Sequence, residues 1–277
     1  MGIQIVLGAA LCLLFAAGDA IAAEHGGVRE FSVYHSIESF TWREYSGGSK
    51  LLEEEGAIFG VGAAVTYDPL KTAAGFLTIR GRGELFGGDV DYDGQTQPPN
   101  SLPVKTDVVY FGTTEELSTG WSFPVGSALV EPFAGIGHRW WLRDLQDSTA
   151  RNTSGASVAV QGYTEQWQTI YSKFGMDVDY RINDQWQLFG ELGGKYPFYN
   201  TNQVDVTGAG TLTIRPVGRW SLFGELGARY RKFRMAFFYD SYRTDRSPAV
   251  PVSSSLSILQ PESREDIVGA RFSWCFR

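Results

Sequence analysis

Apolar and polar side chains alternate with a period of two over most of the chain that follows its first two dozen residues. In the segment from Gly75 to Phe86, for example, Thr78, Arg80 and Glu84 alternate with apolar or small residues. Successive side chains of a β-strand point to opposite faces, so this pattern predicts extended strands with one apolar and one polar face. A soluble sandwich and a transmembrane barrel both show this alternation, with the polar face outward in the first and inward in the second.

Strand length and aromatic placement favour the transmembrane barrel. The runs Trp186–Asn200 and Trp220–Tyr239 are longer than the usual strand of about 5–6 residues. Strands that cross a membrane need about 9–11 residues within the hydrocarbon and can extend beyond it. Aromatic residues also gather near the ends of the predicted strands, as interfacial belts require. They are Trp186 and Trp220 at strand starts, with Tyr196, Phe198, Tyr230, Trp140 and Trp141 near the other ends.

The links between strands alternate between short and long, which is also typical of transmembrane barrels. The short links are Asp68–Lys71, Asn183–Gln185 and Pro216–Arg219, and the long polar ones are Gln95–Pro103, Asp144–Gln161 and Ser241–Ser263. The predicted strands are 30–44, 54–67, 72–92, 104–118, 127–143, 162–182, 186–200, 208–216, 220–240 and 262–276. The pattern therefore predicts an all-β fold, a closed antiparallel transmembrane β-barrel of about ten strands, and leaves eight or twelve strands open.

The first residues have the composition of an export signal. Residues 3–17 form an apolar stretch too short to span a membrane comfortably, and small residues follow at Ala20, Ala22 and Ala23. We therefore expect residues 1–23 to be a cleaved secretory signal peptide and residues 24–277 to form the barrel domain.

Three glycine-rich aromatic segments carry a resemblance to a known class. The run Trp186–Tyr196 (WQLFGELGGKY) returns as Trp220–Tyr230 (WSLFGELGARY), and Pro132–Trp140 (PFAGIGHRW) has a similar make-up. These segments resemble the ascending strands of bacterial outer-membrane β-barrel proteins, and Val268–Phe276 resembles the C-terminal insertion signal of that class. The resemblance implies an integral protein of the Gram-negative outer membrane, in contact with outer-membrane lipid and lipopolysaccharide. It also implies insertion by the barrel assembly machinery through the C-terminal strand.

Composition excludes several classes of function. The chain has 24 basic and 31 acidic residues and no Lys/Arg-rich run, so we expect no nucleic-acid partner. Two cysteines and three histidines are too few for a disulfide scaffold or a His/Cys-rich metal cluster.

The inward parity of the strands defines a set of candidate lumen residues. They are Arg80, Arg82, Glu84, Lys173, Asp177, Asp179, Glu191, Lys195, Glu225, Arg229, Arg231, Glu265 and Arg271. A ten-stranded barrel is only slightly wider than eight-stranded barrels, whose interiors are filled by side chains. Buried charges must also be paired or they cost several kcal/mol each. We therefore expect an ion-pair network that plugs the lumen, with a narrow solute or ion channel as the alternative.

One acidic run has the opening of a calcium-binding loop. Asp89, Asp91 and Asp93 place carboxylates at positions 1, 3 and 5, and Gly94 occupies position 6. Position 12 is Asn100 in place of the usual glutamate, so the simpler interpretation is a strand end whose carboxylates meet water. Calcium is the only cofactor for which the sequence offers a candidate site.

Two kinds of barrel hydrolase can be tested against the sequence. An omptin-type protease pairs aspartates on one external edge with an Asp-His couple on another, and Asp89, Asp91 and Asp93 could supply the first pair. The matching position after Asn200 contains Asp205 but no histidine. A lipid-facing serine hydrolase would need a histidine at the outer rim, and His138 is the only candidate, with no assignable serine or orienting acid. We therefore expect a structural or surface-interaction barrel that is not an enzyme.

Overall fold

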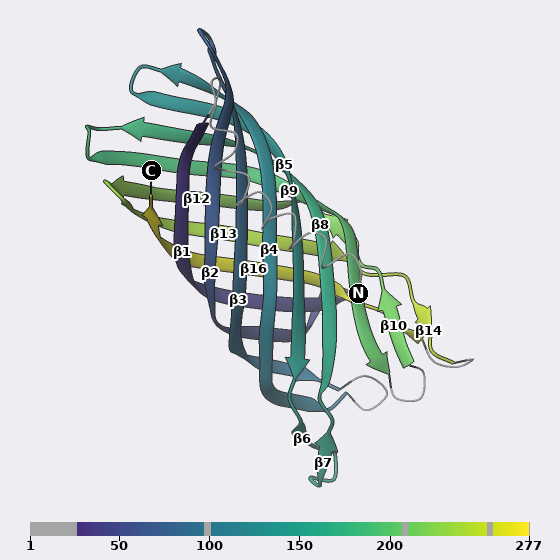
Figure 1. Cartoon of the computed structure of the whole chain (residues 1–277). Coiled ribbons are helices and arrows are strands. Elements are labelled where there is room, and N and C mark those ends of the chain that lie inside the picture. The colour runs from purple at the N-terminus through teal and green to yellow at the C-terminus, as the bar shows by residue number, and fades with distance from the viewer. Residues whose placement is uncertain (1–26, 97–100, 207–209, 254–256, 277) are drawn as a thin grey trace.

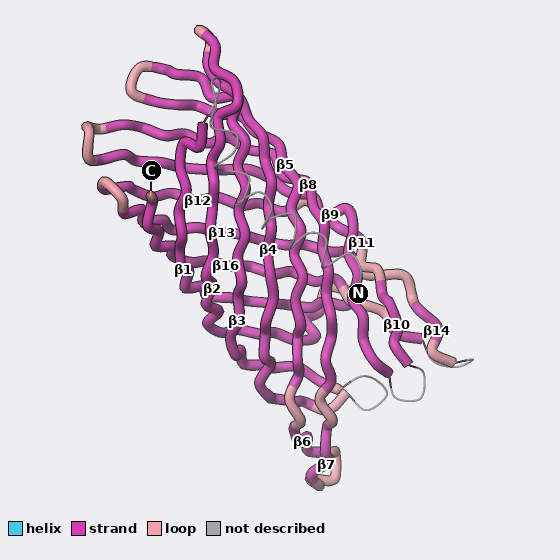
Figure 2. The backbone as a smooth tube through the Cα atoms, in the orientation of Figure 1, coloured by secondary structure: helices cyan, strands magenta, loops and turns pink. Residues whose placement is uncertain are grey.

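The computed structural model describes residues 27–96, 101–206, 210–253 and 257–276. The predicted signal peptide, residues 1–23, lies outside the described residues. Within these ranges, ten long antiparallel strands form one sheet that closes on itself, because β1 pairs with both β2 and β16 (Figures 1 and 2). No helix of the described residues is long and apolar enough to cross a membrane.

The barrel wall is made of ten strands in the order in which they occur along the chain. They are β1 (Gly27–Ser46), β2 (Ser49–Thr72), β3 (Gly75–Gln95), β4 (Pro103–Val125), β5 (Ala128–Leu145), β8 (Tyr163–Arg181), β9 (Trp186–Val206), β12 (Ser221–Tyr230), β13 (Phe233–Asp245) and β16 (Glu262–Cys275). Shorter strands lie in the long connections: β6 (Ser148–Arg151), β7 (Ser157–Val160), β10 (Gly210–Ile214), β11 (Val217–Arg219), β14 (Val250–Pro251) and β15 (Ser257–Ile258).

The two ends of the barrel differ in their connections. The links β2–β3, β4–β5, β8–β9 and β12–β13 are short, and we call this the turn end; β1 begins and β16 finishes there (Figure 1). The other end, which we call the hairpin end, carries the tight β1–β2 turn and the longer links between β3 and β4, β5 and β8, β9 and β12, and β13 and β16. The predicted closed ten-stranded barrel is therefore confirmed.

The predicted parsing of one region is wrong. The segment 208–216 is not a wall strand, since β10 pairs only with β9 in a hairpin, and Pro216–Arg219 belongs to a long connection in which β11 pairs with β13. The predicted strand 220–240 is instead two wall strands, β12 and β13, joined at Arg231 and Lys232. Arg231 has φ 55°, a left-handed conformation that glycine or asparagine usually supplies at such turns, so the sequence carries no turn signal.

The repeated segments Trp186–Tyr196 and Trp220–Tyr230 do not both ascend. They lie in neighbouring antiparallel strands, β9 and β12, with Trp186 opposite Tyr230 and Glu191 opposite Glu225. The alternation of a strand is the same in both chain directions, so the pattern does not reveal which way a segment runs. The antiparallel arrangement places aromatic pairs at both ends of the repeat, Trp186 with Tyr230 and Tyr196 with Trp220, at ring-centroid distances of 4.8 Å and 5.5 Å.

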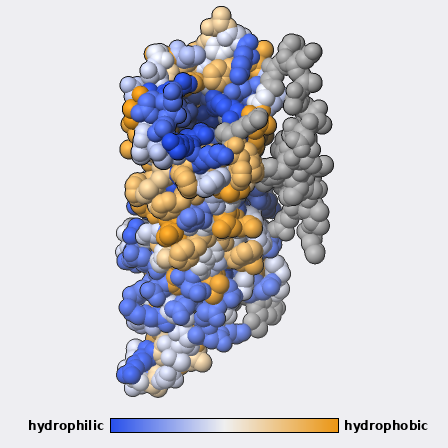
Figure 3. All heavy atoms as spheres, turned by 60° about the vertical axis from the view of Figure 1, so that its left-hand side comes forward, coloured by the Kyte–Doolittle hydropathy of each residue, from blue (hydrophilic) through white to orange (hydrophobic). Residues whose placement is uncertain are grey.

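The outer face of the wall is apolar. Phe59, Leu192, Leu226 and Phe237 all point outward and are more than half exposed, with fractions between 57% and 70%. Figure 3 shows hydrophobic residues gathered around the middle of the barrel, with hydrophilic residues at both ends. Such a band suits hydrocarbon, because soluble monomers rarely expose apolar surface on this scale.

Aromatic rings on the inner face lie against glycines of neighbouring strands. A Cβ atom added to Gly137 would be 2.2 Å from Cζ of Tyr171, and one added to Gly227 would be 2.3 Å from Cζ of Phe189. These distances leave no room for a side chain. The high glycine content, 33 residues, thus goes together with the aromatic content, since inward glycines make space for inward rings.

We expect Gly137→Ala to destabilise the barrel by about 2 kcal/mol, because the new methyl group must displace the Tyr171 ring. The measurement is the urea unfolding midpoint of the refolded protein in detergent micelles. Gly190→Ala is the matched control, since a Cβ atom there is 3.5 Å from its nearest neighbour. Equal midpoints for the two variants would contradict this packing.

Candidate functional site

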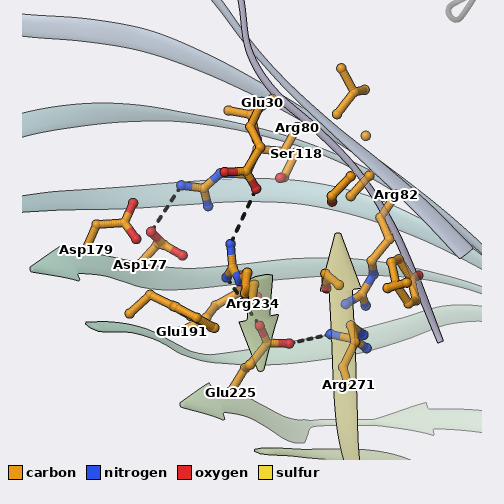
Figure 4. Close-up of a pocket in the computed structure, with 18 of the residues that line it drawn as sticks. Glu30, Arg80, Arg82, Ser118, Asp177, Asp179, Glu191, Glu225, Arg234 and Arg271 are labelled. Atoms are coloured by element: carbon orange, nitrogen blue, oxygen red, sulfur yellow. Dashed lines mark hydrogen bonds and ion pairs between the residues drawn. The ribbon is translucent and has the colours of Figure 1, made fainter. Parts of the chain in front are cut away.

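A charged chamber occupies the lumen at the turn end. Its cavity of about 150 Å³ is lined by side chains of several strands that point toward one another (Figure 4). Figure 3 shows a hydrophilic hollow at the same end of the barrel, uppermost in that view. Because charged side chains from several strands meet around this one cavity, the chamber is the first candidate for a functional site.

Two carboxylates organise the middle of the chamber. Glu225 of β12 accepts hydrogen bonds from Arg271 of β16 and, at 3.3 Å, from Arg234 of β13. On the facing wall Glu116 of β4 lies 2.8 Å from Arg82 and 3.0 Å from Lys173. Each carboxylate therefore binds two cations from other strands, which ties separate strands together through the interior.

Further pairs line the rest of the chamber. Arg80 lies 3.0 Å from Glu131 and 3.2 Å from Asp177, and Arg229 pairs with Glu30 of β1. The chamber thus contains cations and anions in close alternation, with no single-sign surface that would select one kind of ion.

The structure brings twelve of the thirteen sequence-predicted lumen residues to the interior. Ten of them line the chamber or the smaller space next to it on the side of the hairpin end: Arg80, Arg82, Glu84, Lys173, Asp177, Asp179, Glu191, Glu225, Arg229 and Arg271. Lys195 and Glu265 are buried nearer the hairpin end. Arg231 is the exception, since it lies in the exposed β12–β13 turn with its guanidinium 5.3 Å from the Tyr230 ring. The prediction that Arg231 faces the lumen is wrong, because the sequence pattern gives no sign of the turn between β12 and β13.

An arginine crosses the barrel on the side of the chamber that faces the hairpin end. Arg139 of β5 binds Glu265 of β16, and four wall strands separate β5 from β16 in either direction, so this pair joins opposite walls. Both side chains are almost fully buried, at 4% and 1% exposure. The guanidinium lies between 4.7 Å and 4.9 Å from the rings of Phe86, Trp141 and Tyr242, which adds cation–π attraction to the ion pair.

Aromatic side chains fill the lumen toward the hairpin end. Trp42 of β1 lies 5.2 Å from Trp167 of β8, and Trp141 of β5 stacks on Trp167 at 5.5 Å. Since β1 and β8 are also opposite strands, these rings meet across the barrel axis. Beside them Arg143 of β5 binds Glu54 of β2, with Nε 3.0 Å from Oε1. We call Trp42, Trp141 and Trp167 the tryptophan layer.

Sequence reasoning missed several interior charges. The inward parity of Arg139 and Arg143 was available, because both lie an odd number of positions from the outward His138. The inward direction of Glu54 and Glu116 was harder to predict. Each stands next to another glutamate, so one glutamate faces inward whichever way the alternation is assigned.

The aspartates of the predicted calcium loop lie on the outer face of β3. Asp91 is opposite Glu55 and Asp107 in the sheet, and Asp93 accepts a bond from Lys105 at 2.8 Å, which raises the pKa of Lys105. The described residues contain no group of three or more histidine, cysteine or acidic side chains placed to hold a metal ion. Position 12 of that loop, Asn100, lies outside the described residues.

His138, the candidate for a lipid-facing hydrolase, also lies on the outer face. Nδ1 of His138 is 2.8 Å from Oε2 of Glu115, so the prediction that His138 lacks an orienting acid is wrong. Glu115 was overlooked because it lies on another strand and meets His138 only through the β4–β5 register. Asp205, at the position compared with an omptin couple, accepts a hydrogen bond from Thr211.

Comparison with known proteins supports the fold. No protein-family model and no curated protein matches the sequence. Among solved structures, the outer membrane protease OmpT from Escherichia coli superposes with a TM-score of 0.58 at 12% identity, covering 92% of this chain and 99% of that one. The translocator domain of the autotransporter NalP from Neisseria meningitidis gives 0.42 at 13% identity, covering 98% and 96%. A major outer membrane protein from Thermus thermophilus gives 0.36 at 14% identity, covering 87% and 99%.

The chain therefore has the fold of an integral outer-membrane β-barrel. In outer-membrane barrels the short turns face the periplasm and the longer loops face outward, and the chamber lies at the end of this barrel that carries the short turns. At 12% identity the match to OmpT shows the fold alone, and the activity of OmpT is not transferred to this chain.

We expect Glu225→Ala to destabilise the folded barrel by about 3 kcal/mol, because Arg271 and Arg234 would lose their shared counter-charge. Glu225→Gln keeps an acceptor and should cost less. The measurement is urea unfolding in micelles, with heat-modifiable gel mobility as a check on folding.

Glu262→Ala is the control for this prediction, because Glu262 pairs with the exposed Arg264 and Arg219, and exposed pairs contribute about 0–1 kcal/mol. If neither Glu225 variant moves the unfolding midpoint, the ion pairs do not stabilise the lumen.

Proposed function

We propose that the protein is an outer-membrane barrel of structural or surface-interaction type, whose lumen is closed and whose contacts are made by its outer face and hairpin end. The observation that carries this proposal is the tryptophan layer, in which rings from opposite walls touch. Rings in van der Waals contact across the axis leave no continuous path for a solute. The Arg139–Glu265 pair obstructs the lumen a second time, nearer the turn end.

The hairpin end supports the surface role. The β6–β7 hairpin forms a separate two-stranded sheet, and so does β14–β15, while β9 and β10 continue past the wall (Figure 1). Loops held by a rigid scaffold commonly carry binding functions, and this wall provides such a scaffold.

A narrow channel is the second candidate, and the charged chamber is the observation that favours it. A channel would use the chamber as a periplasmic vestibule and would require the tryptophan layer to move. A hydrolytic role for the chamber finds less support, because its carboxylates are engaged by arginine and lysine and the two described histidines, His35 and His138, face outward.

We expect the purified protein to give no current steps in planar lipid bilayers at neutral pH. The triple variant Trp42→Ala/Arg139→Ala/Trp167→Ala should give steps, because it removes the two rings that meet across the axis and the arginine that obstructs the lumen nearer the turn end. Trp220→Ala is the control, since Trp220 lies on the outer face and its removal leaves the lumen unchanged. Regular steps from the unmodified protein, with ion selectivity altered by Glu225→Gln, would replace the closed-barrel proposal with the channel.

A further inference from the structure

Three polar side chains form a hydrogen-bonded chain on the lipid-facing wall. Nδ1 of His138 (β5) is 2.8 Å from Glu115 of β4, and its Nε2 is 3.1 Å from the amide nitrogen of Gln168 of β8. An amide nitrogen can only donate, so Nε2 accepts from Gln168 and Nδ1 carries the proton that is donated to Glu115. Three neighbouring strands thus each contribute one member of the chain.

This chain lies within the apolar band. On β4, the outward residues around Glu115 are Leu117 on one side and Thr113 followed by Phe111 on the other. On β5, the outward neighbour of His138 toward the turn end is Ile136. Phe111, Leu117 and Ile136 are each about half exposed. Gln168 ends the apolar outward run of β8 on the side of the hairpin end. The chain therefore lies toward the outer leaflet, where polar side chains on a lipid-facing surface are costly and usually serve a function.

The chain still offers hydrogen-bonding groups to a ligand. The bond to His138 uses one of the two oxygens of Glu115, and the carbonyl oxygen of Gln168 remains an acceptor. Trp140 is the next outward residue of β5 and is directly opposite Gln168 in the sheet; its Nε1 is buried and has no partner among the described residues. Two acceptors thus lie beside one unpaired donor, and that donor is covered by protein atoms, so it reaches a ligand only when the Trp140 ring turns outward.

We propose that Glu115, His138, Gln168 and Trp140 bind the amide- or hydroxyl-bearing part of an acyl lipid in the outer leaflet. An amide or a hydroxyl donates to the carboxylate or to Gln168 and accepts from the indole N–H, while the acyl chain lies over the apolar residues around the site. A phosphate group fits less well, because Glu115 would repel it. Lipopolysaccharide carries both groups on its anchor, whereas phosphatidylcholine carries neither. The proposal does not depend on whether the lumen is closed.

The test uses the small number of histidines. The folded protein, with its imidazole nitrogens labelled with ¹⁵N, is placed in phosphatidylcholine nanodiscs alone, with lipopolysaccharide, or with ceramide, which supplies an amide and hydroxyls without phosphate. His35 is an internal control, because it is also outward-facing but stacks on Phe272, at 5.2 Å, and has no acidic partner among the described residues. We expect the ring nitrogens of His138 to shift on addition of lipopolysaccharide, and those of His35 to stay unchanged.

A response to ceramide as well as lipopolysaccharide supports the amide and hydroxyl chemistry by itself, and a response to lipopolysaccharide alone supports that lipid as the source. No shift of His138, or an equal shift of His35, overturns the proposal. A His138 signal that depends on the number of barrels per phosphatidylcholine disc also overturns it, since a second copy would then cover the site.

Trp140→Phe removes the indole N–H and keeps a ring, so we expect the lipopolysaccharide concentration at half-maximal shift to rise about fivefold, the effect of one lost hydrogen bond. Trp220→Phe, at an outward tryptophan whose ring lies 5.5 Å from that of Tyr196, should leave this concentration unchanged. Equal titrations for both variants and the unmodified protein count against the site.

Discussion

The pairing of Arg139 with Glu265 across the barrel shows the constraint on which the interior depends. A ten-stranded barrel is too narrow for a wide aqueous channel, so inward charges are largely removed from water. Each inward charge must then meet an opposite charge. Successive inward residues of one strand are about 7 Å apart along that strand, so the partners come from other strands. The chamber pairs around Glu225 and Glu116 obey the same requirement. Ion pairing in this barrel is therefore also what joins its walls through the interior.

The lumen divides into two parts with different physical character. Toward the turn end the charges leave a small polar cavity, and toward the hairpin end aromatic side chains occupy the lumen, with rings of the tryptophan layer meeting across its axis. Inward glycines such as Gly137 make this filling possible, because a ring can lie directly against their backbone. Charged pairs and aromatic rings therefore both join opposite walls of the barrel through its interior.

The outer wall is apolar except where neighbouring strands place polar side chains in register. His138 is an isolated residue in the sequence, and it becomes part of a chain only through the pairing of β4, β5 and β8. The lipid-facing surface therefore has a chemically distinct place on it, independent of the lumen and of the hairpins.

The amino-acid sequence by itself determined the fold class and the inward or outward direction of most side chains, because period-two alternation is a local property of each strand. It indicated about ten wall strands and left eight or twelve open. It did not reveal the turn at Arg231, whose left-handed backbone carries no glycine or asparagine, and so the strand count was right while two strands were merged and a hairpin was mistaken for a wall strand. Partners were decided only by the tertiary structure. Arg139 and Glu265 are 126 residues apart, and Glu115 and His138 meet through register, because closure of the sheet and the stagger of its strands determine which side chains face each other.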